Sequence, residues 1–209
     1  MAHFEEAEAV DLPGHPHGQL CPTVDGYVEW LRGVLRPVAP KELVLVGHSL
    51  GGAIALCYAW KHPEEMKAVV TVGSGGRLRV HPMILEELEK IIPEPGRFPD
   101  FFGPGLTGVD PQLRQVLSRR MQENGPAAML NDFRACDGFD IMDRLGEVPV
   151  PTLALCGDQD VMTPPKYSHF LGKSMPACRV EIIPGGTHYV ALEKPGEVNR
   201  AIAAFLASL

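Results

Sequence analysis

The stretch ELVLVGHSLGGAIALCYAW, residues 42–60, decides the fold class of this 209-residue chain. Residues 42–46 are a short apolar run, which is typical of a strand buried on both faces of a parallel sheet. Residues 53–60 are apolar on every side, which predicts a buried helix that ends at His62-Pro63. Between strand and helix lies GHSLG, residues 47–51, a GxSxG motif in the context that presents a serine nucleophile.

The turn between the two elements makes Ser49 the candidate nucleophile. Such a serine lies on a strained backbone, and we expect the small Gly47 and Gly51 to let strand and helix approach each other closely. The backbone N–H of Leu50 then begins the helix and can stabilise an oxyanion. The alternative is a glycine-rich turn that carries a surface serine, and the flanking elements favour the nucleophile.

Outward from this unit, strand-like and helix-like segments alternate, which predicts an α/β fold with a mostly parallel sheet flanked by helices. Strands are expected at residues 67–72, 152–156 and 179–183, and helices at residues 23–35 and 197–209. Residues 77–147 show only helical pieces between Pro and Gly. We therefore predict a core made of residues 1–76 and 148–209, interrupted by a helical insertion at residues 77–147.

Composition excludes several classes of function. Nineteen Lys and Arg against 26 Asp and Glu give a net charge of −7, which argues against nucleic acid or an anionic membrane as the main partner. Hydrophobic residues make up 45% of the chain, so it is expected to fold. The five cysteines include no CxxC pair, and the start of the chain has no signal-peptide pattern. These features predict a reduced, soluble, cytoplasmic protein.

A serine nucleophile needs a base and a group that orients the base. Among the eight histidines, His188 has the best setting, because it follows a predicted strand and a glycine-containing loop. The loop GDQDVMTPP, residues 157–165, also follows a strand, so its carboxylates are expected at the same carboxyl edge of the sheet as Ser49. Asp158 and Asp160 both remain candidates; we favour Asp160, with Asp158 forming a turn within its own loop.

These segments together resemble the α/β-hydrolase superfamily over nearly the whole chain. DLPGH at residues 11–15 is similar to the DLPGHG segment of that family, and residues 47–52, 157–165 and 185–195 are similar to its nucleophile, acid and histidine motifs. The resemblance implies that Asp160 is the catalytic acid and that the helical insertion is a cap over an acyl pocket. It leaves the substrate open.

The insertion and the loops supply candidates for binding. We predict that Phe133, Met129, Phe139 and Met142 bind substrate, although apolar stripes of this kind are more often plain core. Four carboxylates lie between Asp132 and Asp143 without a histidine among them, which favours caps and turns over a metal site. His15-Pro-His17 lacks nearby partner ligands. No metal and no cofactor are predicted.

The combined prediction is a serine hydrolase of carboxylic esters or lactones that uses Ser49, His188 and Asp160. Its partner is a small-molecule ester or lactone, and a homo-oligomer is compatible with the sequence. Two alternatives share the same residues: a cofactor-free haloperoxidase or perhydrolase-like enzyme, and a weakly catalytic ligand receptor. A peroxide assay separates the first, and slow single turnover with a stable adduct separates the second.

The start of the chain departs from the resemblance. In the family, a strand ending in His-Gly precedes the DLPGHG segment, and its loop supplies a second oxyanion N–H. Residues 1–10 are acidic and lack a buried-strand pattern, so we expect the N-terminal strands of the family to be missing. The gap would be closed by the first strand itself or by a partner chain, or the chain is a truncated form. The loop at residues 14–18 is a candidate substitute donor, and weak hydrolysis is expected.

Overall fold

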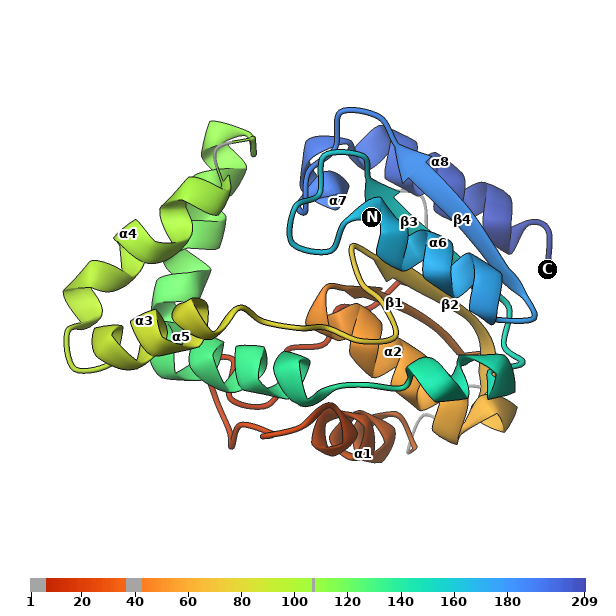
Figure 1. Cartoon of the computed structure of the whole chain (residues 1–209), viewed down its shortest axis with the longest axis horizontal. Coiled ribbons are helices and arrows are strands. Elements are labelled where there is room, and N and C mark those ends of the chain that lie inside the picture. The colour runs from red at the N-terminus through yellow and green to blue at the C-terminus, as the bar shows by residue number, and fades with distance from the viewer. Residues whose placement is uncertain (1–6, 37–42, 107) are drawn as a thin grey trace.

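The computed structural model describes residues 7–36, 43–106 and 108–209, and of residues 104 and 105 it describes the backbone alone. Its centre is a parallel sheet of four strands: β1 (Leu43–His48), β2 (Met66–Val72), β3 (Thr152–Gly157) and β4 (Cys178–Ile183). They lie side by side in the order β1-β2-β3-β4, which is also their order along the chain. The predicted parallel sheet flanked by helices is confirmed (Figure 1).

Helices cover both faces of this sheet. On one face, α2 (Leu50–Lys61) packs on β1 and β2, and α6 (Pro165–Ser174) packs on β3 and β4. The helix α1 (Val24–Leu35) lies outside α2. On the other face, the short α7 (Val190–Glu193) leads into α8 (Pro195–Leu206), which packs on β3 and β4. A 3-10 turn, η1 (Pro63–Glu65), joins α2 to β2.

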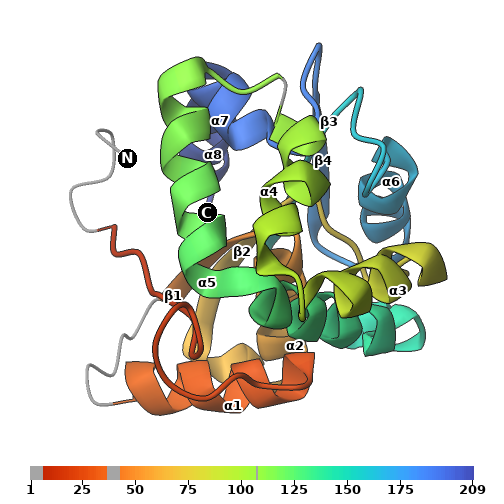
Figure 2. The same ribbon diagram turned by 90° about the vertical axis from the view of Figure 1, so that its left-hand side faces the viewer.

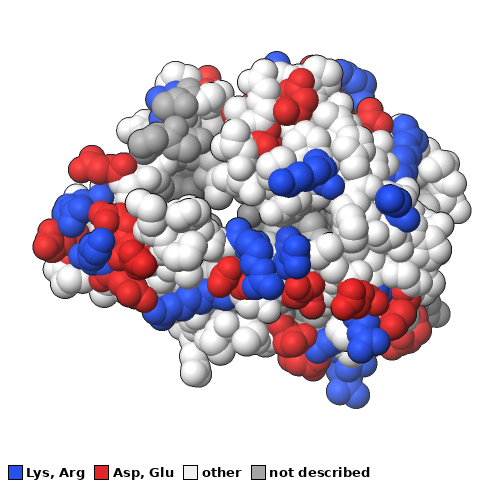
Figure 3. All heavy atoms as spheres, in the orientation of Figure 1, with Lys and Arg blue, Asp and Glu red and all other residues white. Residues whose placement is uncertain are grey.

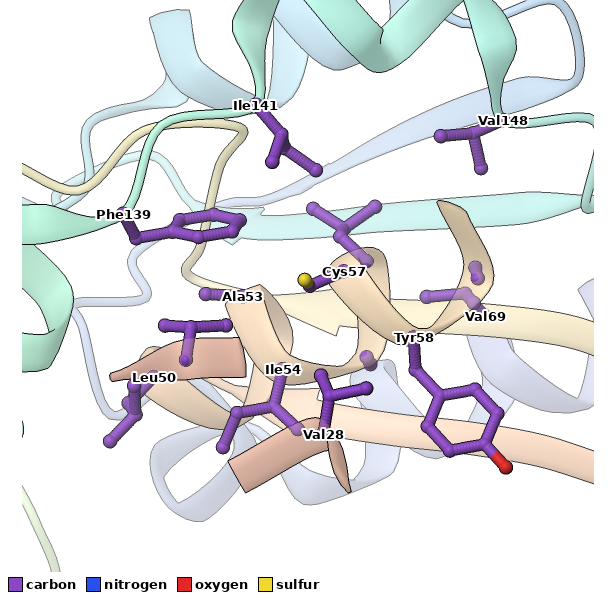
Figure 4. Close-up of a cluster of buried hydrophobic side chains, with 14 of the residues drawn as sticks. Val28, Leu50, Ala53, Ile54, Cys57, Tyr58, Val69, Phe139, Ile141 and Val148 are labelled. Carbon is purple, nitrogen blue, oxygen red and sulfur yellow. The ribbon is translucent and has the colours of Figure 1, made fainter. Parts of the chain in front are cut away.

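The main core lies between the sheet and the layer of α1 and α2. Ala53, Ile54, Cys57 and Tyr58 of α2 are each at most 2% exposed, as the all-round apolar composition of this helix predicts. Figure 4 shows these side chains between Val28 of α1 and residues such as Val69 of the sheet. Successive residues of β2 alternate between the two faces of the sheet. Ala68 and Val70, on either side of Val69 in the strand, therefore join the separate core under α8. Burial on both faces holds the strand ends, and hence the loops that follow them, in fixed positions.

All regular elements that the structure describes between β2 and β3 are helical. They are α3 (Pro82–Ile91), α4 (Phe98–Phe102), α5 (Pro111–Gly138) and the 3-10 turns η2 (Pro95–Arg97), η3 (Gly103–Leu106) and η4 (Met142–Glu147). Helix α5 is bent at Gly125, where φ is 79°, directly before Pro126. Figures 1 and 2 show α3, α4 and α5 standing beside the sheet, and they share an apolar core of their own.

One prediction about the sheet is wrong. Residues 42–46 were expected to be buried on both faces, but β1 is an edge strand of the described sheet, and Val46 is 55% exposed. The strand that fits the fully buried pattern is β3, all of whose residues are buried. An apolar run indicates that a strand packs against a hydrophobic core, but it does not reveal whether the strand has neighbouring strands on both sides. Residue 42 and residues 1–6 lie outside the described part of the chain.

None of the described helices is both long enough and apolar enough to span a membrane.

Candidate active site

Ser49 occupies the sharp turn from β1 into α2. Its backbone has φ 53° and ψ −116°, and it is the only residue other than glycine with a positive φ in the described ranges. Two neighbouring elements hold this strained turn: Ser49 N–H donates to the carbonyl of Val72 at 2.9 Å, and Ser49 C=O accepts from Gly52 N–H at 3.0 Å. The predicted strand, tight turn and helix are therefore present, with the serine in the left-handed region that side chains rarely adopt.

Close packing at the turn depends on two glycines, of which only one was predicted. A Cβ on Gly47 would lie 2.1 Å from the carbonyl oxygen of Gly51, so strand and helix touch there as expected. A Cβ on Gly51 would meet nothing within 4 Å, so that part of the prediction is wrong. The second close approach is at Gly52, where a Cβ would lie 2.5 Å from Cβ of Ser74.

Ser74 lies in the Gly-Ser-Gly-Gly stretch of residues 73–76, outside the GxSxG motif. In the structure it is 1% exposed, and its hydroxyl donates to the carbonyl of Ser49 at 2.8 Å. It follows the end of β2, which lies next to β1. Ser74 therefore supports the backbone of the turn that carries Ser49, a role that arises from strand pairing and has no local sequence signal.

Asp160 and His188 are brought together from two different loops. Asp160 follows β3, His188 lies between β4 and α7, and Asp160 Oδ2 is 2.9 Å from Nδ1 of His188. Both residues are buried, at 3% and 6% exposure. Since a carboxylate only accepts, the geometry corresponds to donation from Nδ1–H to Asp160 and leaves Nε2 as the other ring nitrogen.

Further donors surround the carboxylate of Asp160. Oδ1 accepts from the N–H groups of Met162 at 2.9 Å and Thr163 at 2.8 Å, and Oδ2 accepts from the Thr163 hydroxyl at 2.8 Å. Burial by itself raises the pKa of Asp160. The hydrogen bond and the charge of His188, together with the hydrogen bonds from Thr163, lower that pKa below its usual value. Thr163 was not singled out from the sequence, although it lies in the quoted loop three residues after Asp160.

Asp158, the competing carboxylate, contacts a different group. Its Oδ1 accepts from the N–H of Gly185 at 2.7 Å, in the loop that leads to His188. It was expected to bond within its own loop, and that expectation is wrong. Of the two aspartates, Asp160 contacts the imidazole and Asp158 joins the acid loop to the histidine loop.

His48, the residue before Ser49, turns toward the histidine loop. Its Nε2 donates to the carbonyl of His188 at 2.8 Å, and the two imidazole rings are 4.6 Å apart between centroids. Its contact to His188 fixes the β1 end against the loop after β4.

A small pocket of about 50 Å³ lies beside Ser49. It is lined by Ser49, Leu78, Arg79, Val80, Phe133, Cys136, Met162, Thr163, Tyr167 and His188. Of the four predicted substrate-binding residues, Phe133 is in this lining. Met129 packs in the core shared by α3, α4 and α5, Phe139 is buried in the main core, and Met142 lies in η4 outside the lining. Helical periodicity showed that these residues face apolar surroundings without showing which ones.

The backbone N–H of Leu50 begins α2, where the first N–H groups of a helix have no partner within the helix. The loop at residues 14–18 does not supply a second donor. Gly14 N–H donates to the carbonyl of His17 at 2.6 Å and His15 N–H donates to that of Leu12 at 3.0 Å, so both are used within the loop. This loop borders a separate hollow of about 580 Å³ and is absent from the lining at Ser49.

Two clusters in the described residues bear on metal binding. Asp132 is not a cap or a solvated turn residue, because it accepts from Tyr27 at 2.6 Å and contacts His15 Nε2 at 2.7 Å. His15 is thus part of a polar junction between the 11–22 loop and α5. Ligand atoms of His62, Glu64 and Glu65 lie within 4.8 Å of one another. The Glu65 oxygens already accept from Arg32 and from Tyr58, which leaves them poorly suited to a cation.

The elbow serine, the acid–imidazole pair at the carboxyl edge of a parallel sheet and the helical insertion together define a class of enzyme. Residues 2–201 match the sequence profile of the alpha/beta hydrolase family. The chain belongs to the alpha/beta hydrolase family.

Its relatives include esterases. A solved structure of a thermophilic esterase is 36% identical, covers 95% of this chain and 79% of its own, and superposes with a TM-score of 0.80. The pimeloyl-[acyl-carrier protein] methyl ester esterase of Vibrio atlanticus is 27% identical over 197 residues, which are 86% of this chain and 75% of that protein. The enol-lactonase from Burkholderia xenovorans, at 16% identity and a TM-score of 0.81 over 94% of this chain and 79% of its own, shares the fold.

Proposed function

We propose that this chain is a serine esterase that cleaves carboxylic esters through an acyl-enzyme. The observation that carries the proposal is the placement of three groups. Ser49 lies on a strained elbow, His188 lines the same pocket, and His188 Nδ1 is 2.9 Å from Oδ2 of Asp160. Nucleophile, base and orienting acid are the groups that acyl transfer requires.

Each group has one role in the proposed reaction. Nε2 of His188 takes the proton of Ser49 while Oγ forms a bond to the acyl carbon. The carbon–oxygen bond to the alcohol then breaks, and His188 returns the proton to the leaving alcohol. Water, activated in the same way, attacks the acyl-enzyme and releases the acid and free Ser49. Asp160 stays ionised throughout, in agreement with the lowered pKa of its carboxyl group, and stabilises the imidazolium.

The negative charge that develops on the carbonyl oxygen needs donors in fixed positions. Leu50 N–H is the first of α2, at the positive end of a 12-residue helix. We assign it as an oxyanion donor. The buried helix behind this amide fixes its position, so the donor needs no reorganisation when the charge develops.

The names of similar proteins support the ester as the reacting group. The thermophilic esterase is 36% identical to this chain, and the Vibrio atlanticus relative is named for a methyl ester. The pocket volume supports a short acyl part, because a single water needs about 10–15 Å³ of such space. A pocket of about 50 Å³ therefore has room for about four groups the size of water.

A panel of p-nitrophenyl esters of increasing acyl length, together with simple lactones, tests this proposal in the wild type and in Ser49→Ala. We expect hydrolysis of short esters, covalent labelling by a fluorophosphonate, and loss of both in Ser49→Ala with an unchanged circular dichroism spectrum. Ser74→Ala is the matched variant: its hydroxyl donates to the Ser49 carbonyl, so labelling at Ser49 should persist. Labelling of Ser49→Ala, or no turnover of any ester by the wild type, would contradict the proposal.

A further inference from the structure

One permanently charged residue, Arg79, lines the pocket at Ser49, and its side chain is 57% exposed. Among the ten lining residues, Arg79 is the only Lys, Arg, Asp or Glu. The rest of the wall includes apolar side chains such as Leu78, Val80 and Phe133. A plain alkyl ester has no group that would use a guanidinium in this position. The positive charge of Arg79 therefore suggests an anionic group on the substrate as its partner.

The segment that carries Arg79 is fixed in place. It crosses from β2 to α3, as the yellow segment of Figure 1 shows, and it lies along the end of α5. Leu78 N–H donates to the carbonyl of Phe139 at 3.4 Å, and Val80 N–H donates to Asp137 Oδ1 at 3.1 Å. Arg79 Nη1 donates to the main-chain carbonyl of Asp137 at 2.8 Å. The guanidinium is thus held before any ligand arrives, which lowers the entropy lost on binding.

The charge of Arg79 is only weakly compensated within the described residues. Its Nη2 is 3.6 Å from Asp140 Oδ2, beyond a good hydrogen bond, and Arg77 shares the same oxygen at 3.6 Å. Two guanidinium groups therefore face one half-exposed carboxylate. Figure 3 shows Lys and Arg side chains gathered near the middle of this face, where the helical elements meet the half that contains the sheet. A guanidinium has five donors, so capacity is left for a second carboxylate.

We infer that Arg79 binds a carboxylate on the acyl part of the substrate, so that the preferred substrates are monoesters of short dicarboxylic acids. The inference rests on the proposed esterase function and adds its substrate class. The planar fork of arginine matches a carboxylate with two parallel hydrogen bonds. The small pocket limits the chain between the ester carbonyl and the carboxylate to a few carbons, with succinate as the reference length.

Two substrates of the same shape test this inference. Monoethyl succinate carries the carboxylate, and ethyl succinamate replaces it by a neutral amide; release of ethanol is measured for both. We expect the wild type to prefer monoethyl succinate at least about 10-fold in kcat/KM. Arg79→Gln should lower kcat/KM for monoethyl succinate by about 10- to 100-fold, as for loss of a charge-assisted hydrogen bond, and leave ethyl succinamate within about threefold.

Arg77→Gln is the matched control. Arg77 pairs with the same oxygen of Asp140 at the same distance but does not line the pocket, so both substrates should stay within about threefold of the wild type. Equal loss in Arg77→Gln, equal rates on both substrates in the wild type, or a loss on both substrates in Arg79→Gln would each overturn the inference while the esterase proposal stands. Failure of the wild type to hydrolyse any ester would overturn both.

Discussion

Replacing Asp160 by asparagine removes the charge of this side chain and keeps its shape. One carboxylate oxygen accepts two backbone N–H groups, from Met162 and Thr163, and the other faces Nδ1 of His188. Backbone N–H groups only donate, so the single oxygen of asparagine is expected to stay with them. The new NH₂ group then faces Nδ1, which must accept. The imidazole proton moves to Nε2, and the ring can no longer take the proton of Ser49.

The expected loss is about 10⁴-fold in kcat, because wrong-tautomer substitutions in such triads have effects of this size. That factor corresponds to about 5.5 kcal/mol of transition-state stabilisation. The assay is steady-state hydrolysis of p-nitrophenyl acetate, with thermal unfolding to show that the variant is folded.

Asp158→Asn is the comparison. Its side-chain oxygen can still accept from Gly185 N–H, so we expect a loss of less than about 10-fold, since that bond is retained. If Asp160→Asn kept a tenth of the wild-type activity, or if Asp158→Asn lost as much as Asp160→Asn, the assigned orientation of His188 would be wrong.

Two further predictions concern stability. The hydrogen bond to Asp132 raises the pKa of His15. The pair therefore stabilises the fold fully below the unfolded pKa of about 6.5, and this contribution is lost as pH rises through the folded pKa. The free energy of unfolding in urea should show this decline between pH 6 and 9 in the wild type and not in His15→Gln, and the same pH dependence in both would contradict the prediction. Gly52→Ala should destabilise the folded protein by about 1–3 kcal/mol, because the new Cβ meets Ser74. Gly51→Ala adds a Cβ in open space and should be neutral or stabilise the protein by up to about 1 kcal/mol. Equal melting temperatures for the two variants would refute this prediction.

Much of the fold follows from local patterns. The apolar residues before and after GHSLG place β1 and α2, and Asp110 before Pro111 marks the start of α5, where Asp110 Oδ1 accepts from Gln112 N–H at 2.9 Å. Such features depend on neighbours in sequence, so periodicity and capping chemistry are enough to find them.

The parts that could not be predicted depend on which elements meet. Whether β1 is central or at an edge is decided by strand pairing, and the exposed Val46 carries no local sign of it. Ser74 belongs to a Gly-Ser-Gly-Gly stretch that reads as a turn, yet it contacts Ser49, 25 positions away. Arg79 is likewise an ordinary surface arginine in sequence. It acquires meaning only because the segment after β2 passes beside the pocket.

The order of the strands explains why one more glycine is needed at the site. Ser49 follows β1 and Asp160 follows β3, so the end of β2 lies between them. The residue there is Gly73, with φ 55°, and a Cβ on it would lie 3.0 Å from Asp160 Oδ2 and 3.2 Å from Nδ1 of His188. Any side chain would press on the acid–imidazole pair and strain the backbone as well. A parallel sheet therefore brings these groups to one edge, and a glycine at the intervening strand end leaves the space in which they meet.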